Sequence, residues 1–412
     1  MPPLAEPTRR SAYLVAAVAS AITLAVMLMP EVSFAASLEG LRVWWEIVFP
    51  ALLPFFILCD VLMGLGVVHY IGALLEPLMR PLFGVPGVGA FAFAMGLASG
   101  YPIGARITAR LRREGMCSRV EAERLVSFTN TADPLFMVGA VAVGMFRMPS
   151  LGATLAASHY ISAVIVGLLL KFYGHRDPES SSAEAGRRSR EPLLARAAHA
   201  LYTARHQDGR SFGQIFGDSV RDSVATLLLI GGCIMLFSVV VRVLDVAGVT
   251  HLAATAVRWV LSPLKMSTAI IPSLMSGTFE ITLGTEIASR AAAPLSQRAI
   301  AASAIIAWSG LSVFAQVAAM LHGTDVRMKP YLSARLLHAA LAAAVTKALL
   351  ILSPAILGAS ALPEGVLAFQ PGFMWNMARS LASAAVVMGL LGLAAVGTAT
   401  VAHPRPTQHR RR

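Results

Sequence analysis

The sequence is poor in charge, in cysteine and in recognisable enzyme motifs. Only 14% of its 412 residues are Asp, Glu, Lys or Arg, and 56% are hydrophobic. Soluble domains average roughly 25% charged residues. The three cysteines lie far apart, so they fit neither a disulfide framework nor a metal-binding spacing. These shortages exclude an ordinary soluble domain and a disulfide-rich secreted fold, and they indicate a polytopic membrane protein.

Motifs for nucleotide-driven or hydrolytic chemistry are also missing. The chain has no Gly-x-x-x-x-Gly-Lys-Ser/Thr loop, no His-Glu-x-x-His and no Gly-x-Ser-x-Gly. Its formal net charge is +12, but the arginines cluster in loops and tails without interleaved aromatic residues. Such a pattern sets membrane topology and is not typical of a nucleic-acid surface. We therefore expect no enzymatic activity, catalytic residue, cofactor, metal site or nucleic-acid partner.

The hydrophobic runs predict a series of membrane-spanning helices. Residues 11–29, behind Arg9 and Arg10, form either a cleaved signal peptide or a retained first span, and we favour the span. Trp44 and Trp45 open the next run, as expected of an interfacial belt. Spans are expected at 43–68, 118–146, 151–172, 220–241, 298–321, from after Arg335 to about 352, and after Arg379, with interfacial helices at 69–83 and 249–265. The prediction is an all-α polytopic membrane protein with about eight full spans.

Four stretches interrupt this regular pattern. Residues 84–105 and 266–289 carry glycine, proline and polar side chains at bilayer depth, so each predicts a re-entrant helical hairpin that enters and leaves on one side. Two spans are broken as well, at 130–134 and at 309–312. Secondary transporters place their binding sites in such broken elements.

The two halves of the chain repeat each other. Leu97-Ala-Ser-Gly100 is answered by Leu274-Met-Ser-Gly277, within the same order of span, interfacial helix, hairpin, broken span and span. Each unit has three crossings and one hairpin, so the second copy starts on the opposite side of the membrane. The basic stretches 106–124 and 327–335 then both fall inside, as the positive-inside rule requires. The sequence predicts an inverted repeat with both termini in the cytoplasm.

The predicted repeats and the segments around them divide the chain into five parts. They are 1–42, a first span or signal-like segment; 43–173, the first repeat; 174–218, a cytoplasmic linker with a surface helix around 193–204; 219–353, the second repeat; and 354–412, the last span and a basic cytoplasmic tail.

A substrate site is expected near the midplane, where the breaks of the two repeats meet. Helix N-termini offer unpaired amides that bind carboxylate or phosphate. Asn130, Asp133 and Glu280 are the strongest candidates, because such groups are costly at bilayer depth and usually functional. Glu286 and Arg290 are expected to form a surface pair. The substrate-binding set is Ser99, Gly100, Tyr101, Pro102, Asn130, Thr131, Asp133, Ser276, Gly277, Thr278, Glu280, Thr282, Ser309, Ser312 and Gln316.

The stretch Ser99-Gly-Tyr-Pro-Ile-Gly-Ala-Arg106, followed by Asn130 and by Asp133-Pro-Leu-Phe136, resembles the YlbJ (SpoVV) family of sporulation integral membrane proteins. More broadly, it is similar to the gate or nucleoside-recognition domain of concentrative nucleoside transporters and of bacterial ferrous-iron transporters. The resemblance implies export of dipicolinic acid from the mother cell across the outer forespore membrane. The family pattern near Asn130 reads Asn-Asn/Ser-Gly-Pro, from which Thr131-Ala-Asp-Pro134 departs.

Three functions stay open at this point. Transport of a small anionic metabolite is our choice; a nucleoside or metal-ion permease of the same architecture and a non-transporting scaffold for spore assembly are the alternatives. The expected partners are a small-molecule substrate and the lipid bilayer, with a coupling ion and a homo-oligomer as further options.

Overall fold

The computed structural model describes residues 9–174, 192–249, 254–255, 257–259 and 262–352. Within these ranges every regular element is a helix. Four helices in the described ranges are long and apolar enough to cross a membrane, and two bent pairs raise the number to six if each pair is one span. The protein is therefore an all-α polytopic membrane protein, as predicted. The predicted span after Arg379, with the rest of 354–412, lies outside the described residues.

The described helices form two series, one on each side of the undescribed residues 175–191. The first half has α1 (Arg9–Leu28), α2 (Pro30–Val43), η1 (Trp44–Val48), α3 (Phe49–Gly64), α4 (Val67–Leu78), η2 (Met79–Phe83), α5 (Gly89–Ser99), α6 (Ile103–Arg113), α7 (Arg119–Thr129), η3 (Phe136–Met145) and α8 (Pro149–Leu170). The second has α10 (Leu193–Asp208), α11 (Phe212–Val246), η4 (Ser262–Leu264), η5 (Thr268–Ile270), α13 (Ile271–Phe279), α14 (Ile281–Arg290), α15 (Leu295–Trp308), α16 (Gly310–Leu321) and α17 (Met328–Leu352). The predicted surface helix in the linker is α10, which packs against α4.

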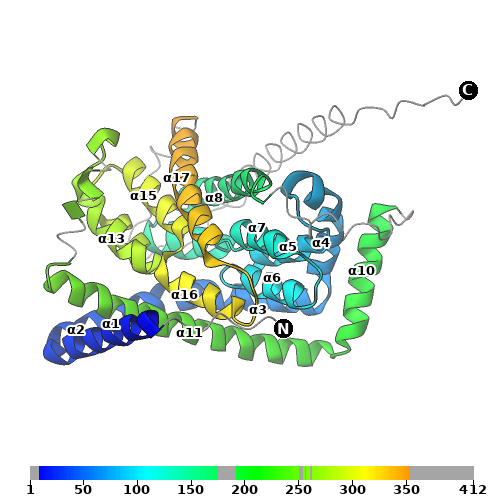
Figure 1. Ribbon diagram of the computed structural model, residues 1–412, viewed down its shortest axis with the longest axis horizontal. Coiled ribbons are helices and arrows are strands. Elements are labelled where there is room, and N and C mark those ends of the chain that lie inside the picture. The colour runs from blue at the N-terminus through cyan, green and yellow to red at the C-terminus, as the bar shows by residue number, and fades with distance from the viewer. Residues whose placement is uncertain (1–8, 175–191, 250–253, 256, 260–261, 353–412) are drawn as a thin grey trace, which may run out of the picture.

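One long helix from each half lies beside the other. The α2–η1–α3 helix packs along α11, which follows the lower edge of the view in Figure 1. A Cβ at Gly231 would lie 2.6 Å from the Trp44 ring, so glycine is what permits this close approach. Trp44 is buried, and its indole N–H donates to the Leu227 carbonyl at 2.8 Å. The interfacial role predicted for Trp44 is therefore wrong, since it joins two helices; Trp45 is 59% exposed.

The two hairpins bend at different residues. In the first, α5 and α6 meet at Gly100–Pro102, and in the second, α13 and α14 meet at Glu280. The first hairpin extends to Arg113, so arginines predicted in a loop at 106–124 lie on α6. The pattern explains the difference: Arg106 and Arg110 lie on the exposed face of α6, whereas small residues are buried on its other face.

Both predicted broken spans are present. The first is non-helical from Asn130 to Asp133, between α7 and η3, and the second bends at Ser309, whose φ is 74°. The capping box predicted at Ser118 is also present: its hydroxyl accepts from the Glu121 amide at 3.1 Å, and the Glu121 carboxylate accepts from the Ser118 amide at 2.8 Å.

Helices of one half pack against helices of the other in matching pairs. Helix α6 packs against α16, while its counterpart α14 packs against η3; likewise α7 packs against α17, and α15 against α8. Helices α8 and α17 pack against each other at the centre. This exchange is what a pseudo-twofold relation between the halves produces. The inversion of the second copy across the membrane, and the cytoplasmic position of the termini, stay predictions.

Candidate functional site

A cavity of about 60 Å³ lies where broken elements of the two halves meet. Six of the predicted site residues line it: Tyr101, Asp133, Glu280, Thr282, Ser312 and Gln316. Apolar side chains from η1, α3, η3 and α11 complete the wall, with the free thiol of Cys233 among them. The fold thus brings residues of both halves of the chain to one cavity, up to 268 positions apart, since Val48 and Gln316 both line it.

Each half contributes one buried carboxylate, and each carboxylate caps a helix. The Asp133 carboxylate accepts from the amides of Leu135 at 3.0 Å and Phe136 at 2.8 Å, at the start of η3. The Glu280 carboxylate accepts from the Leu283 amide at 2.8 Å, at the start of α14. The helix N-termini predicted to hold an anion therefore already hold the protein's own carboxylates.

Two side chains tie these elements to their surroundings. The Thr282 hydroxyl donates to the Glu280 carboxylate at 3.2 Å. The Tyr101 hydroxyl crosses from the first hairpin to the second half and donates to the Ile306 carbonyl at 3.0 Å. Tyr101 thereby fixes the tip of the first hairpin against the end of α15.

The other predicted residues do not line this cavity. They are Ser99, Gly100, Pro102, Asn130, Thr131, Ser276, Gly277, Thr278 and Ser309. Several support it from behind: the Asn130 amide donates to the Tyr331 hydroxyl at 2.7 Å, and the Thr131 hydroxyl donates to the Gly96 carbonyl at 3.1 Å. Thr278 is exposed and bonds to its own helix, at the Leu274 carbonyl. Ser276 lines a second cavity, of about 770 Å³, between α2, α11, α13 and α14.

Arg335 is a buried residue that is not among the predicted site residues. The basic stretch 327–335 predicts a loop, but α17 begins at Met328, which places Arg335 two turns inside a helix and fully out of solvent. Its guanidinium donates to the carbonyls of Ser127 and Asn130, the latter at 3.1 Å. It also contacts the Ala307 carbonyl at 3.5 Å. One cation therefore binds the carbonyl ends of α7 and α15, where both spans break.

The spacing of polar residues along α17 could have revealed this. Tyr331, Arg335 and His338 lie four and then three residues apart, on one face of a helix that is otherwise rich in alanine and leucine. All three are buried. A polar stripe within an apolar helix indicates a face turned toward the protein interior.

A histidine pair lies beside Arg335, between α8 and α17. The rings of His159 and His338 are 4.6 Å apart, and both are buried. His159 Nε2 accepts from the Ala132 amide at 3.1 Å, so that nitrogen carries no proton. His338 Nε2 lies 2.9 Å from the His159 carbonyl and donates to it. The pair holds the backbone of the first break, just before Asp133.

Glu286 and Arg290 form the predicted ion pair, but only Arg290 lies at the surface. The side chain of Arg290 is 73% exposed and that of Glu286 is 7% exposed. Among the residues that the structure describes, no group of three or more His, Cys, Asp or Glu is placed to hold a metal ion.

The fold and the site define a multi-pass membrane protein with a gate-type domain. Residues 45–172 match a family model described as "Gate: Nucleoside recognition". No solved structure matches the chain. Over 325 residues the chain is 49% identical to "Sporulation integral membrane protein YlbJ" of Bacillus subtilis (strain 168), covering 78% of each protein. The chain therefore belongs to the YlbJ family of sporulation integral membrane proteins.

Proposed function

We propose that this protein is a permease, and not an enzyme, that moves a small anionic metabolite, namely dipicolinic acid, out of the mother cell across the outer forespore membrane. The observation that carries the proposal is the cavity that Tyr101 and Asp133 of one half line together with Glu280 of the other. Membership of a sporulation membrane family supports the setting. A site shared by two repeated halves is the arrangement of many secondary transporters.

The capping contacts support a carboxylate substrate. The amides of Leu135, Phe136 and Leu283 already hold carboxylates, so their geometry suits that group. In the proposal, a carboxylate of dipicolinate takes the place of the Asp133 or Glu280 side chain at one helix end. The displaced side chain then holds a proton or a cation, which moves with the substrate. Arg335 supplies positive charge behind the site.

The size of the cavity supports a closed state. A volume of about 60 Å³ has room for a few water molecules. Small-molecule sites usually measure about 300–1,000 Å³. The proposal therefore includes an opening movement that enlarges the cavity when substrate enters.

The experiment uses vesicles containing the purified protein and compares uptake of labelled dipicolinate with that of labelled nucleoside and divalent cation. Asp133→Asn and Glu280→Gln keep a helix-capping side chain while removing the charge. We expect each to lower dipicolinate movement by about tenfold or more, with unchanged protein level. Glu114→Gln, at an exposed position after α6, is the matched control.

The alternatives give different outcomes. Movement of nucleoside or cation without dipicolinate would establish the other permease class. The matching family model is described by nucleoside recognition, which favours a nucleoside as the substrate of that class. Correct membrane insertion with no movement of any of the three would favour a scaffold. Unchanged dipicolinate movement in both acidic-residue variants would remove these side chains from the mechanism.

A further inference from the structure

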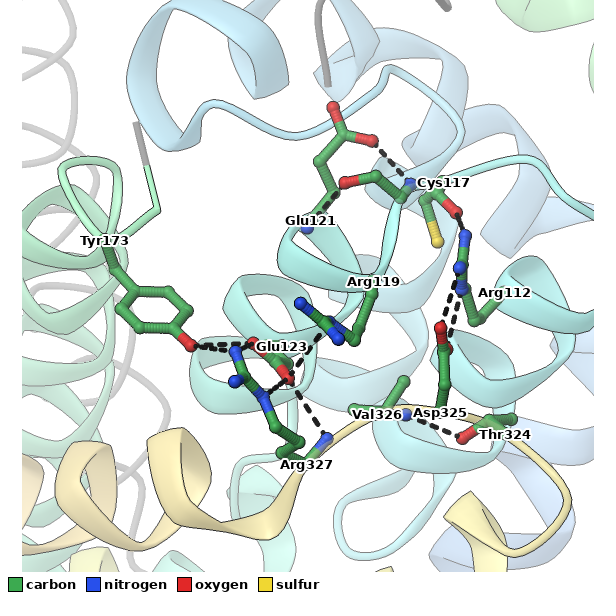
Figure 2. A network of polar contacts seen from close by, with 11 residues as sticks. Arg112, Cys117, Arg119, Glu121, Glu123, Tyr173, Thr324, Asp325, Val326 and Arg327 are labelled. Atoms are coloured by element: carbon green, nitrogen blue, oxygen red, sulfur yellow. Dashed lines mark hydrogen bonds and ion pairs between the residues drawn. The ribbon is translucent and has the colours of Figure 1, made fainter. Parts of the chain in front are cut away.

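A network of ion pairs joins the two halves at the far ends of α6 and α16 (Figure 2). Arg112, near the end of α6, donates to both carboxylate oxygens of Asp325, at 2.8 and 2.9 Å. Asp325 lies in the loop between α16 and α17. Arg112 also donates to the Cys117 carbonyl at 2.9 Å, which fixes the guanidinium in place. Such paired hydrogen bonds are the strongest form of the arginine–carboxylate contact.

A second ion pair of reversed polarity lies two residues further along the same loop. Arg327 donates to the two oxygens of the fully buried Glu123 carboxylate at 2.7 and 3.0 Å, and its backbone amide donates to Glu123 at 3.2 Å. The Tyr173 hydroxyl, just after α8, donates to Glu123 at 2.8 Å. In each pair one charge comes from the first half and the opposite charge from the second (Figure 2).

Two adjacent helices connect this network to the cavity. Tyr101 lies two residues before α6, and Ser312 and Gln316 lie in the first two turns of α16, so both helices begin at the cavity. They pack against each other and end at the network. At 1.5 Å per residue, Arg112 lies roughly 14 Å along α6 from its first residue.

The space between cavity and network is filled by apolar side chains. Leu111 of α6 and Val313, Val317 and Leu321 of α16 are buried in one hydrophobic cluster. Water or substrate can pass this way only if α6 and α16 part, and that movement must break the Arg112–Asp325 contact.

We propose that the Arg112–Asp325 and Glu123–Arg327 pairs are a gate that closes the substrate cavity on the side predicted to face the cytoplasm. This inference rests on the proposed transport function. The second cavity, of about 770 Å³, lies further along α11: Cys233 lines the substrate cavity, whereas Ser238 and Asp245 line the second one, together with Leu283, next to Thr282 of the substrate cavity. One side closed and the other hollowed is the arrangement that alternating access requires in one of its states.

The ion pairs bias the equilibrium between closed and open states. Both hold the loop between α16 and α17 against the first half only while the gate is closed, so removing them favours opening. Glu123 is fully buried, so its charge depends on Arg327 and Tyr173 for compensation.

Cys233 provides a test that does not depend on substrate. It lines the cavity, so its alkylation by a membrane-impermeant maleimide added on the network side reports opening there. In a Cys59→Ala, Cys117→Ala background we expect slow labelling. Asp325→Arg is expected to speed labelling about tenfold. Adding Arg112→Asp to Asp325→Arg restores the pair in reverse polarity and is expected to return labelling to the slow rate.

The matched control is Arg110→Asp, which removes the exposed Arg110–Glu114 contact within α6 and leaves the network intact. Equal labelling rates in Asp325→Arg, its rescue and this control would overturn the gate. If labelling follows the gate prediction while vesicles move no dipicolinate, the gate stands and the proposed substrate fails.

A cross-link tests the same gate through transport. With the native cysteines replaced by alanine, Arg112→Cys and Asp325→Cys are joined by a thiol-specific cross-linker that contains a reducible disulfide and spans the length of the former ion pair. We expect the cross-link to stop dipicolinate movement and a reductant to restore it. The control carries Arg110→Cys and Glu114→Cys, both on the first-half side. Undiminished movement in the cross-linked Arg112–Asp325 variant would overturn the gate.

Discussion

Both halves reach the cavity with a helical hairpin and a broken span but place their carboxylates differently. In the first half the acid is at the broken span, at Asp133, and the hairpin tip around Gly100 has none. In the second half the acid is at the hairpin, at Glu280, and the break at Ser309 has none. Each acid caps the helix that follows it. The two halves thus both contain helix breaks at the cavity, whereas the side chains that accept from the exposed amides differ in position.

The packing of the hairpins differs as well. A Cβ at Gly96 would lie 1.8 Å from the Thr129 carbonyl oxygen, so the first hairpin packs directly on the backbone of its broken span. In the second half, a Cβ at Gly277 would meet the Ile305 side chain at 2.6 Å. A backbone contact cannot relax as a side chain can, so a larger residue is accommodated less easily at Gly96 than at Gly277.

Arg335→Gln tests the asymmetry with the largest expected effect, because the cation that binds the carbonyls at both helix breaks comes from the second half. Losing it leaves the Ser127, Asn130 and Ala307 carbonyls without that donor. We expect a loss of about 3 kcal/mol or more in stability, visible as a large fall in Tm, and no measurable transport. Lys329→Gln, at an exposed position near the start of α17, is the control. A Tm equal to that of the control would show that Arg335 does not hold the breaks together.

A comparison of Gly96→Ala with Gly277→Ala tests how tightly each hairpin is packed. We expect Gly96→Ala to destabilise by about 1–3 kcal/mol, because the Thr129 carbonyl cannot move without its helix. Gly277→Ala should cost less, since Ile305 can change rotamer. Thermal unfolding of the two variants, measured side by side in the same detergent, checks the order. A larger loss of stability in Gly277→Ala would contradict the expected order of the two variants.

Tyr101→Phe against Trp308→Phe separates contacts between the halves from contacts within one. Tyr101 bonds across the halves to Ile306, whereas the Trp308 indole bonds to the Thr278 carbonyl of its own half at 3.1 Å. Each loss should cost about 1 kcal/mol in stability. Only Tyr101→Phe should also change dipicolinate movement, by a few-fold. Equal transport in both variants would show that the bond between the halves is not used.

The smallest expected effect is that of pH on the Arg112–Asp325 ion pair. Hydrogen bonding to Arg112 holds the pKa of Asp325 below its ordinary value, although partial burial opposes this. Because the pKa is lowered in the folded protein, the contribution of the pair is present above the ordinary aspartate value and is lost only as pH falls through the lowered one. We therefore expect the ratio of Cys233 labelling rates between Asp325→Arg and the protein with the native pair to stay constant between about pH 5 and pH 8, since thiolate formation raises both rates alike. A marked change in that ratio near pH 6 would assign the gate to another group.

The sequence by itself determined the class of the fold and the positions of its breaks. Scarce charge and long apolar runs require a membrane protein, since such a chain has too little polar surface for water. Glycine and proline near Gly100, Pro134 and Gly310 place the helix interruptions within a few residues, because these residues limit the backbone locally. Asp133 and Glu280 were found for the same reason, since an acid beside a break in an apolar run is conspicuous.

Only the tertiary structure decided which charged residues are buried and which of them form ion pairs. In the sequence, Arg335, Arg327 and Arg112 are all members of basic stretches near the membrane. In the fold, Arg335 lies in the core, while the other two close the network between the halves. The reason is physical: a break depends on its neighbours in the chain, whereas the partner of a charge depends on which distant helices pack together. Arg112 and Asp325 are 213 positions apart, and only the packing of α6 against α16 brings them into contact.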